Sequence, residues 1–325
     1  LELVTGTSDV DPWTDLPVVS LYGEESVSLK PDPACFEDLD LLLIDLQDVG
    51  ARYYTYAASA VWAAEVAASE GCEVWVLDRP NPLGGERVEG NLRRPGFESF
   101  VGAFEHPVVH GLTLGELAAM ELGRAGYDEQ LRVWHMAGWT RRMLWPDTGR
   151  PWIAPSPNMP RFETAVVYPG LCLVEATTLS EGRGTTRPFQ LVGGLEIDPP
   201  TLAEALGERD LPGVGFMPTY FRPEFQKHAG AICGGVEIVV WDAAVIEAYA
   251  LGVELVSALA EQPGFGWRSD PYEFVSDRAA IDLLTGDDAL RRAVGAGERP
   301  VDWIASWAED EAEFRRRREP HLLYG

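Results

Sequence analysis

The amino-acid sequence predicts an α/β protein, with a mostly parallel sheet in its first part and a smaller α+β unit from about residue 190 onward. Three observations predict this class. Residues 38–85 read as strand, helix and strand in turn, and residues 235–241 read as a strand that a long helical pattern follows. The length of 325 residues fits two domains of ordinary size, each large enough to bury a core.

The first strand and helix open a βαβ unit. The apolar run Leu41–Ile44 ends in acidic residues and is typical of a parallel strand buried on both faces. Apolar residues at helical spacing predict a helix over residues 54–70, and Gly71 stands where a helix ends. A second short apolar run ends at Asp78. Strands joined through a helix in this way lie parallel, and we expect these two to be adjacent.

Polar residues follow both of these strands. They are Asp45, Gln47 and Asp48 after the first strand, and Asp78, Arg79 and Asn81 after the second. Because the carboxyl ends of parallel strands meet at one edge of a sheet, we expect the two groups to emerge together. Open α/β sheets bind their ligands at that edge.

The middle of the chain contains a helix, a strand and a long loop. Thr113–Glu116 has the capping-box pattern and predicts a helix through Leu122 that Gly123 closes. A further strand is predicted over residues 132–136. Residues 139–160 are rich in Pro, Trp and Gly, which favours a long ordered loop.

The last third of the chain contains a second set of elements. Thr201–Glu204 has another capping-box pattern and predicts the start of a helix. The run GVEIVVW predicts a strand over residues 235–241. We expect Asp242 to cap the long amphipathic helix that follows, through Val256.

Composition excludes several classes of protein. The net charge of −26 gives a surface that repels phosphate backbones and anionic membranes, which argues against a nucleic-acid partner. No run of 18 apolar residues is present, so we expect no membrane-spanning segment. The four cysteines include no C-x-x-C pair, which argues against a zinc ribbon or a redox dithiol. Lys30 and Lys227 are the only lysines among 26 basic residues, so nearly every cation is a guanidinium suited to bidentate binding of an anion.

Four irregular segments are dense in polar groups, and loops of this kind carry most sites. They are residues 45–56, 78–85, 155–160 and 168–189. Within the last, residues 181–187 contain one acid, two arginines and two hydroxyls, with glycines that permit close approach of a ligand. This pattern favours an anion or sugar clamp in which Glu181 is catalytic or orders the substrate. The alternative is a solvated turn with a surface Glu–Arg pair.

The strand-end aspartates allow other interpretations. Asp45 and Asp78 are also suited to capping helices or holding Arg52 and Arg79. A phosphoryl-aspartate enzyme would need an acid where Gln47 stands.

The remaining chemistries have weaker signals. One set of residues has the right types for metal ligands, but its spacing in the sequence matches no recognisable metal-binding motif. The set consists of Asp45, Asp48, Asp78 and His110. His110 is equally suited to a structural hydrogen bond and to a base. G-x-G-x-x-G and G-x-S-x-G are both absent from the sequence. We expect neither a metal nor an organic cofactor.

Seven colinear motifs resemble a bacterial family long catalogued as a domain of unknown function and typified by the NamZ-like exo-β-N-acetylmuramidases. They are DLQDVGARYYTY (45–56), VLDRPNPLGG (76–85), PVVHGLTLGELA (107–118), PWIAPSPNMP (151–160), YPGLCLVEATTLSEGRGTTRPF (168–189), FRPEFQKHAGAICGGV (221–236) and the closing HLLYG. The resemblance implies a Rossmann-like domain, a smaller C-terminal domain and an active-site cleft between them. We place these domains at residues 1–188 and 189–325.

The resemblance also implies an activity and a substrate. It implies a glycoside hydrolase that releases terminal N-acetylmuramic acid from the non-reducing end of peptidoglycan fragments, in cell-wall turnover and muropeptide recycling. It favours a place of action outside the cytoplasm, secreted or periplasmic. Family members carry a P-E-H-G segment whose glutamate is a leading catalytic candidate, and this sequence has none; the Gly6–Thr7 junction is where that segment is expected, together with earlier elements.

Roles for individual residues follow from the resemblance and the chemistry of the substrate. The catalytic candidates are Glu181, Asp78, Asp45 and Glu175, and burial of Glu175 in its apolar run is expected to raise its pKa. Arg183 and Arg187 are expected to clamp the lactyl carboxylate, with Arg79 and Arg52 as second choices. Hydrogen bonds to hydroxyls or the acetamido group are expected from Asn81, Asn158, Gln47 and His110, and ring stacking from Tyr54, Tyr56 or Trp152. The alternative to the hydrolase is a non-hydrolytic muropeptide-binding protein with the same cleft. A third possibility, an enzyme that acts on a sugar nucleotide, is disfavoured because the sequence lacks a glycine-rich phosphate loop.

Overall fold

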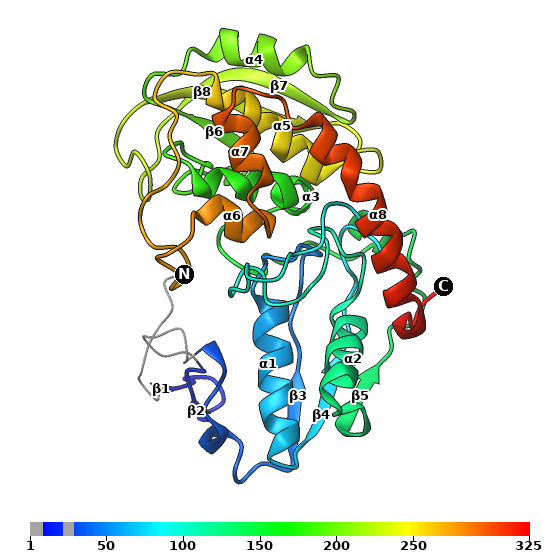
Figure 1. Cartoon of the computed structure of the whole chain (residues 1–325). Helices are drawn as coiled ribbons and strands as arrows, with labels where there is room; N and C mark the ends of the chain where they lie inside the picture. The colour runs from blue at the N-terminus through cyan, green and yellow to red at the C-terminus, as the bar shows by residue number, and fades with distance from the viewer. Residues whose placement is uncertain (1–8, 22–28) are drawn as a thin grey trace.

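The computed structural model describes residues 9–21 and 29–325, which form a lower part and an upper part (Figure 1). A parallel sheet with two helices makes up the lower part, and an antiparallel sheet with most of the other helices makes up the upper part. The predicted α/β class is confirmed. The Gly6–Thr7 junction lies outside the described residues.

The lower sheet has the order β3 (Leu41–Ile44), β4 (Glu73–Leu77), β5 (Leu131–Trp134), and both pairs are parallel. Helices α1 (Tyr56–Ser69) and α2 (Leu114–Ala125) pack against each other and against this sheet. A short antiparallel pair, β1 (Asp9–Val10) and β2 (Pro17–Val18), precedes it. The predicted parallel, adjacent strands and the third strand are confirmed.

One expectation for β3 is wrong. Leu41 and Leu43 are 37% and 51% exposed, whereas Ile44 is 5% exposed, so the strand is buried on one face only. Alternate side chains of a strand point to opposite faces. Since α1 and α2 contact each other and both contact β4, they cover the same face of the sheet.

The upper sheet is antiparallel, with the order β6 (Leu191–Gly194), β8 (Cys233–Val240), β7 (Val214–Phe221). Strand β8 confirms the strand predicted over residues 235–241. Helix α4 (Pro199–Gly207) packs on β7 and β8, while α3 (Phe162–Leu171) and α5 (Ala248–Ala260) pack on each other. Helices α6 (Ala280–Thr285) and α7 (Ala289–Gly295) follow, and α8 (Val301–Arg318) runs from the upper part alongside the lower one (Figure 1).

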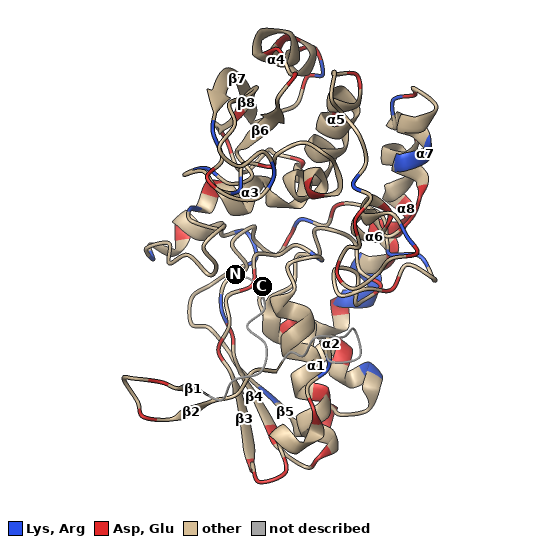
Figure 2. Ribbon diagram, turned by 90° about the vertical axis from the view of Figure 1, so that its left-hand side faces the viewer, with Lys and Arg blue, Asp and Glu red and all other residues tan. Residues whose placement is uncertain are grey.

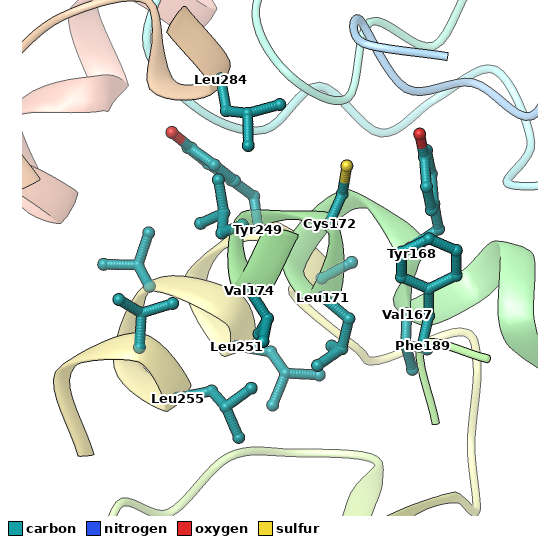
Figure 3. Packing of buried hydrophobic residues seen from close by; sticks show 14 of the residues in the cluster. Val167, Tyr168, Leu171, Cys172, Val174, Phe189, Tyr249, Leu251, Leu255 and Leu284 are labelled. Atoms are coloured by element: carbon teal, nitrogen blue, oxygen red, sulfur yellow. The ribbon is translucent and has the colours of Figure 1, made fainter. Parts of the chain in front are cut away.

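The largest core cluster surrounds the crossing of α3 and α5. A Cβ atom added to Gly170 would lie 2.8 Å from the Cα of Gly252, which shows that the backbones touch where the helices cross. Leu171, Val174 and Leu251 pack together beside this crossing, all buried (Figure 3). The crossing therefore fixes the short 3-10 helix Cys172–Ala176, which continues α3.

Helix ends agree with the sequence in some places and differ in others. The capping box Thr113–Glu116 is confirmed, but α2 continues past Gly123 to end at Gly126, whose φ of 83° suits glycine. The second predicted box is wrong: Asp198 is the N-cap of α4, and its carboxylate accepts the N–H of Thr201 inside the helix. An acid that precedes Pro at the first helical position makes the better cap.

The expectation for Asp242 is also wrong. Helix α5 begins at Ala248, and its N-cap residue is Glu247. The Asp242 carboxylate accepts the N–H of Ala244 at 3.0 Å in a separate turn. Within residues 9–21 and 29–325, none of the helices has the length and apolar character needed to span a lipid bilayer.

Candidate active site

A cavity of about 350 Å³ lies above the carboxyl edge of the lower sheet, against the segment that follows α3. Its aromatic wall comes from residues 53–56, at the start of α1, together with Phe100, Tyr168 and Phe189. Its polar wall consists of Ser156, Asn158, Glu175, Arg183, Tyr272 and Glu273. Three of the four polar segments identified in the sequence thus lie close together with a loop near residue 272.

Glu175 is a buried carboxylate of this cavity with two side-chain partners. It is 7% exposed, and its Oε1 lies 2.5 Å from Nη2 of Arg183 while its Oε2 accepts the Tyr272 hydroxyl at 3.0 Å. A buried carboxylate needs such partners to offset its desolvation. The burial of Glu175 expected from its apolar run is present, and Arg183, expected to bind substrate, is its ion-pair partner.

Arg183 links the two acids of this region. Burial alone would lower the pKa of Arg183, but the charges of Glu175 and Glu181 raise it above its ordinary value. Its guanidinium also lies 5.3 Å from the ring centroid of Phe189, a cation–π contact that fixes its plane. Among the described residues that line this cavity, Arg183 contributes the only guanidinium.

Glu181 lies behind the cavity wall. It is 3% exposed, and its Oε2 is 3.0 Å from Nζ of Lys227. Lys227 also donates to the carbonyl oxygens of Val174, Glu175 and Leu179. The lysine therefore holds the segment between the two glutamates. Sequence reasoning did not assign it a role, although it is one of only two lysines and lies in a family motif.

Glu273 is a second carboxyl in the cavity and was not predicted. Burial, followed by the nearby charge of Glu175, raises its pKa above the ordinary value. In the described part of the chain its carboxyl has no hydrogen-bond or ion-pair partner. Glu273 and Phe274 both adopt positive φ angles, 46° and 67°, an uncommon conformation for residues other than glycine that is often found at functional sites.

Two of the three predicted aromatic residues line this cavity; the third, Trp152, does not, and its indole N–H donates to the carbonyl oxygen of Met159 at 3.0 Å. The rings of Tyr54 and Tyr56 are 4.7 Å apart between centroids, and both residues line the cavity together with Asn158. The Tyr56 hydroxyl donates to the carbonyl oxygen of Pro155 at 2.9 Å. This bond ties the start of α1 to the long loop of residues 139–160.

The strand-end acids are brought to one edge but not into this cavity. Asp78 accepts hydrogen bonds from Thr113, Gly115 and Tyr324, and burial raises its pKa despite them. Asp45 pairs with Arg79 at 2.6 Å, and both line a second cavity, as does Gln47. In the described residues no three His, Cys, Asp or Glu side chains gather as a metal site.

The other predicted binding residues lie elsewhere. Arg52, 6% exposed, donates to the carbonyl oxygens of Asn91, His106 and Leu284. Asn81 donates to Leu112 and accepts from Leu83, and Arg187 pairs with Glu237. None of these three lines the cavity of about 350 Å³.

His110 and Asp48 form a buried pair beneath the site. Nε2 of His110 lies 3.6 Å from Oδ2 of Asp48, and its Nδ1 accepts the N–H of Leu112. Burial lowers the pKa of His110 well below its ordinary value and raises that of Asp48 to about 7. The histidine is therefore neutral and carries its proton on the nitrogen that faces Asp48.

Known proteins match the chain along most of its length. The model described as "Exo-beta-N-acetylmuramidase NamZ, N-terminal" matches residues 4–163, and the model for the C-terminal part of NamZ matches residues 166–324. The peptidoglycan beta-N-acetylmuramidase NamZ of Bacillus subtilis is 38% identical over 317 residues, which are 98% of this chain and 74% of the relative.

Two solved structures have the same fold. Both are DUF1343 family proteins of Bacteroides fragilis, and each alignment covers 97% of this chain and 82% of the other. Their TM-scores are 0.85 and 0.72, at 32% and 29% sequence identity.

Proposed function

Because this chain belongs to the NamZ family of exo-β-N-acetylmuramidases, we propose that it is a glycosidase that releases terminal N-acetylmuramic acid from the non-reducing end of peptidoglycan fragments. One observation is the main support for placing the reaction in this cavity. Glu175 and Glu273 line the same cavity in unlike environments, one paired with a guanidinium and the other without a partner among the described residues.

Because their environments differ, these two carboxyl groups are suited to different roles in the reaction. Glycosidases place a proton donor on one side of the scissile bond and a carboxylate on the other. Burial and the charge of Glu175 raise the pKa of Glu273, which suits it to donate a proton to the glycosidic oxygen. Glu175, paired with Arg183, then stabilises the positive charge that develops at the anomeric carbon. The bond between that carbon and the glycosidic oxygen breaks, water supplies the hydroxyl of the released sugar, and the remaining proton of that water restores the carboxyl of Glu273.

The remaining walls suit the rest of the sugar. Arg183, whose side chain is 28% exposed, is the guanidinium placed to meet the lactyl carboxylate of muramic acid. Tyr54 and Tyr56 offer ring faces to the apolar side of the pyranose, and Asn158 offers an amide to its acetamido group. We also propose that the protein acts outside the cytoplasm, where polymeric peptidoglycan is found.

Release of sugar tests this function. The protein is incubated with the N-acetylmuramyl–N-acetylglucosamine disaccharide, free N-acetylmuramic acid is measured, and binding is measured by calorimetry. We expect release by the unsubstituted protein and by Glu163→Gln, an exposed control on α3. Glu175→Gln and Glu273→Gln should bind the disaccharide and release at most about one hundredth as much. Binding without release by the unsubstituted protein would instead identify a muropeptide-binding protein.

A further inference from the structure

The second cavity, of about 460 Å³, lies beside the candidate active site. It follows the carboxyl ends of β3 and β4, the edge at which open α/β sheets bind ligands. Its wall combines residues 45–47 and Arg79 with the loop that contains Trp145, Arg150 and Ile153. The function proposed above gives these residues no role.

A single tyrosine separates the two cavities. Tyr56 lines both, and its hydroxyl bonds to the carbonyl oxygen of Pro155 at 2.9 Å. Pro155 lines the second cavity and the next residue, Ser156, lines the first. A ligand longer than one sugar that fills the first cavity would therefore meet the second cavity on the other side of Tyr56.

The chemistry of the second cavity suits a carbohydrate. Ile153 is 76% exposed and, with Pro151, gives an apolar surface of the kind that covers one face of a pyranose ring. The Asp45–Arg79 pair keeps 46% and 42% of its side chains exposed, so its donors and acceptors are open to hydroxyl groups. Arg150 has no ion-pair partner in the described part of the chain and offers a free positive charge.

We propose that this second cavity is the leaving-group subsite, which binds the N-acetylglucosaminyl residue after the cleaved bond. In longer fragments Arg150 meets the lactyl carboxylate of the next muramyl residue. The inference rests on the proposed function, because it assigns the reacting sugar to the first cavity.

Substrates of three lengths test the subsite. An aryl glycoside of N-acetylmuramic acid lacks any sugar beyond the bond, the disaccharide has one, and a tetrasaccharide has three. We expect Ile153→Ser to lower kcat/KM for the disaccharide and tetrasaccharide by a larger factor than for the aryl glycoside, whose smaller aglycone covers less of this surface. We expect Arg150→Gln to lower kcat/KM for the tetrasaccharide alone, by about tenfold, as for loss of one charge-assisted hydrogen bond. Both side chains are exposed, so neither substitution removes core packing.

Arg161→Gln is the matched control, since this exposed arginine lines neither cavity. Equal losses on all three substrates, or none, would overturn the subsite while leaving the hydrolase intact. Failure of the unsubstituted protein to hydrolyse any of the three would overturn both the hydrolase and the subsite. Hydrolysis of the aryl glycoside therefore distinguishes loss of the subsite from loss of the hydrolase activity.

Discussion

Lys227 extends from the loop between β7 and β8 to Glu181, with 3.0 Å between its Nζ and Oε2. The same ammonium group binds three carbonyl oxygens of residues 174–179. This one side chain therefore joins the upper sheet to the segment that carries Glu175. Figure 2 shows that Lys and Arg are fewer than Asp and Glu on this fold, so each cation that contacts a buried acid, as Lys227 does, stands out.

The first prediction concerns that lysine. Lys227→Met should lower the free energy of unfolding by about 3–5 kcal/mol, because it removes the ammonium group that pairs with the buried Glu181 carboxylate and donates to three carbonyl oxygens. Chemical denaturation monitored by circular dichroism measures the change. Arg222→Met is the control; its pair with Glu224 is 60% and 67% exposed, so the loss should stay below about 0.5 kcal/mol. A similar small loss for Lys227→Met would contradict the assigned role.

The second prediction concerns the proton donor. Because its raised pKa keeps Glu273 protonated to higher pH than an ordinary glutamate, the alkaline limb of kcat/KM should report its ionisation. Glu273→Gln should remove that limb and reduce kcat for the disaccharide by about 10²–10⁴. An aryl glycoside whose leaving group needs no proton should lose much less. An unchanged alkaline limb in the variant would assign the donor to another group.

The third prediction separates the two arginines expected from sequence to hold the lactyl group. Arg183→Ala should lower activity on muramyl substrates at least about tenfold more than on the glucosaminyl analogue without a lactyl carboxylate. Arg187→Ala should not change this ratio, since Arg187 pairs with Glu237 and does not line the cavity. Initial rates on both substrates measure the ratio. Equal losses on both substrates for Arg183→Ala would reject the clamp.

The fourth prediction concerns stability and pH. Burial raises the pKa of Asp48 from 3.8 to about 7, so the folded state holds this proton more tightly than the unfolded state. The resulting stabilisation is complete below about pH 4 and is lost as the pH rises to about 7, by roughly 1.4 kcal/mol per pH unit. Asp48→Asn keeps an acceptor for the N–H of Gly50 and should flatten this decline. Unfolding curves from pH 4 to 8 that stay parallel to those of the unsubstituted protein would contradict the prediction.

Local sequence patterns predicted the sheet edge well. Asp45 and Arg79, 34 residues apart, were expected at one edge because parallel strands end together, and their side chains are in contact. The polar segments that contain Tyr56, Asn158 and Glu175 also line one cavity, as loops on a rigid sheet should.

Contacts between distant segments were not predictable in the same way. Glu273 comes after Pro271 in a short irregular segment with no periodic pattern, and only the folded chain brings it to Glu175. Lys227 reaches Glu181 through a loop whose course no spacing rule describes. Arg52 was expected at the site because it stands among polar residues, whereas its side chain points to carbonyl oxygens of the interior. Composition near a site does not determine which way a side chain turns.

The bonds of Arg52 have a consequence for how this protein tolerates sequence drift. Its three acceptors are main-chain oxygens, at Asn91, His106 and Leu284, and every amino acid supplies such an oxygen. Replacement of those residues leaves the acceptors in place, so the three bonds of Arg52 do not depend on the side chains of the acceptor residues. The arginine is the one side chain that these three bonds require, whereas Asn91 adds a bond that needs its own amide, from Nδ2 to the carbonyl oxygen of Thr285 at 2.8 Å.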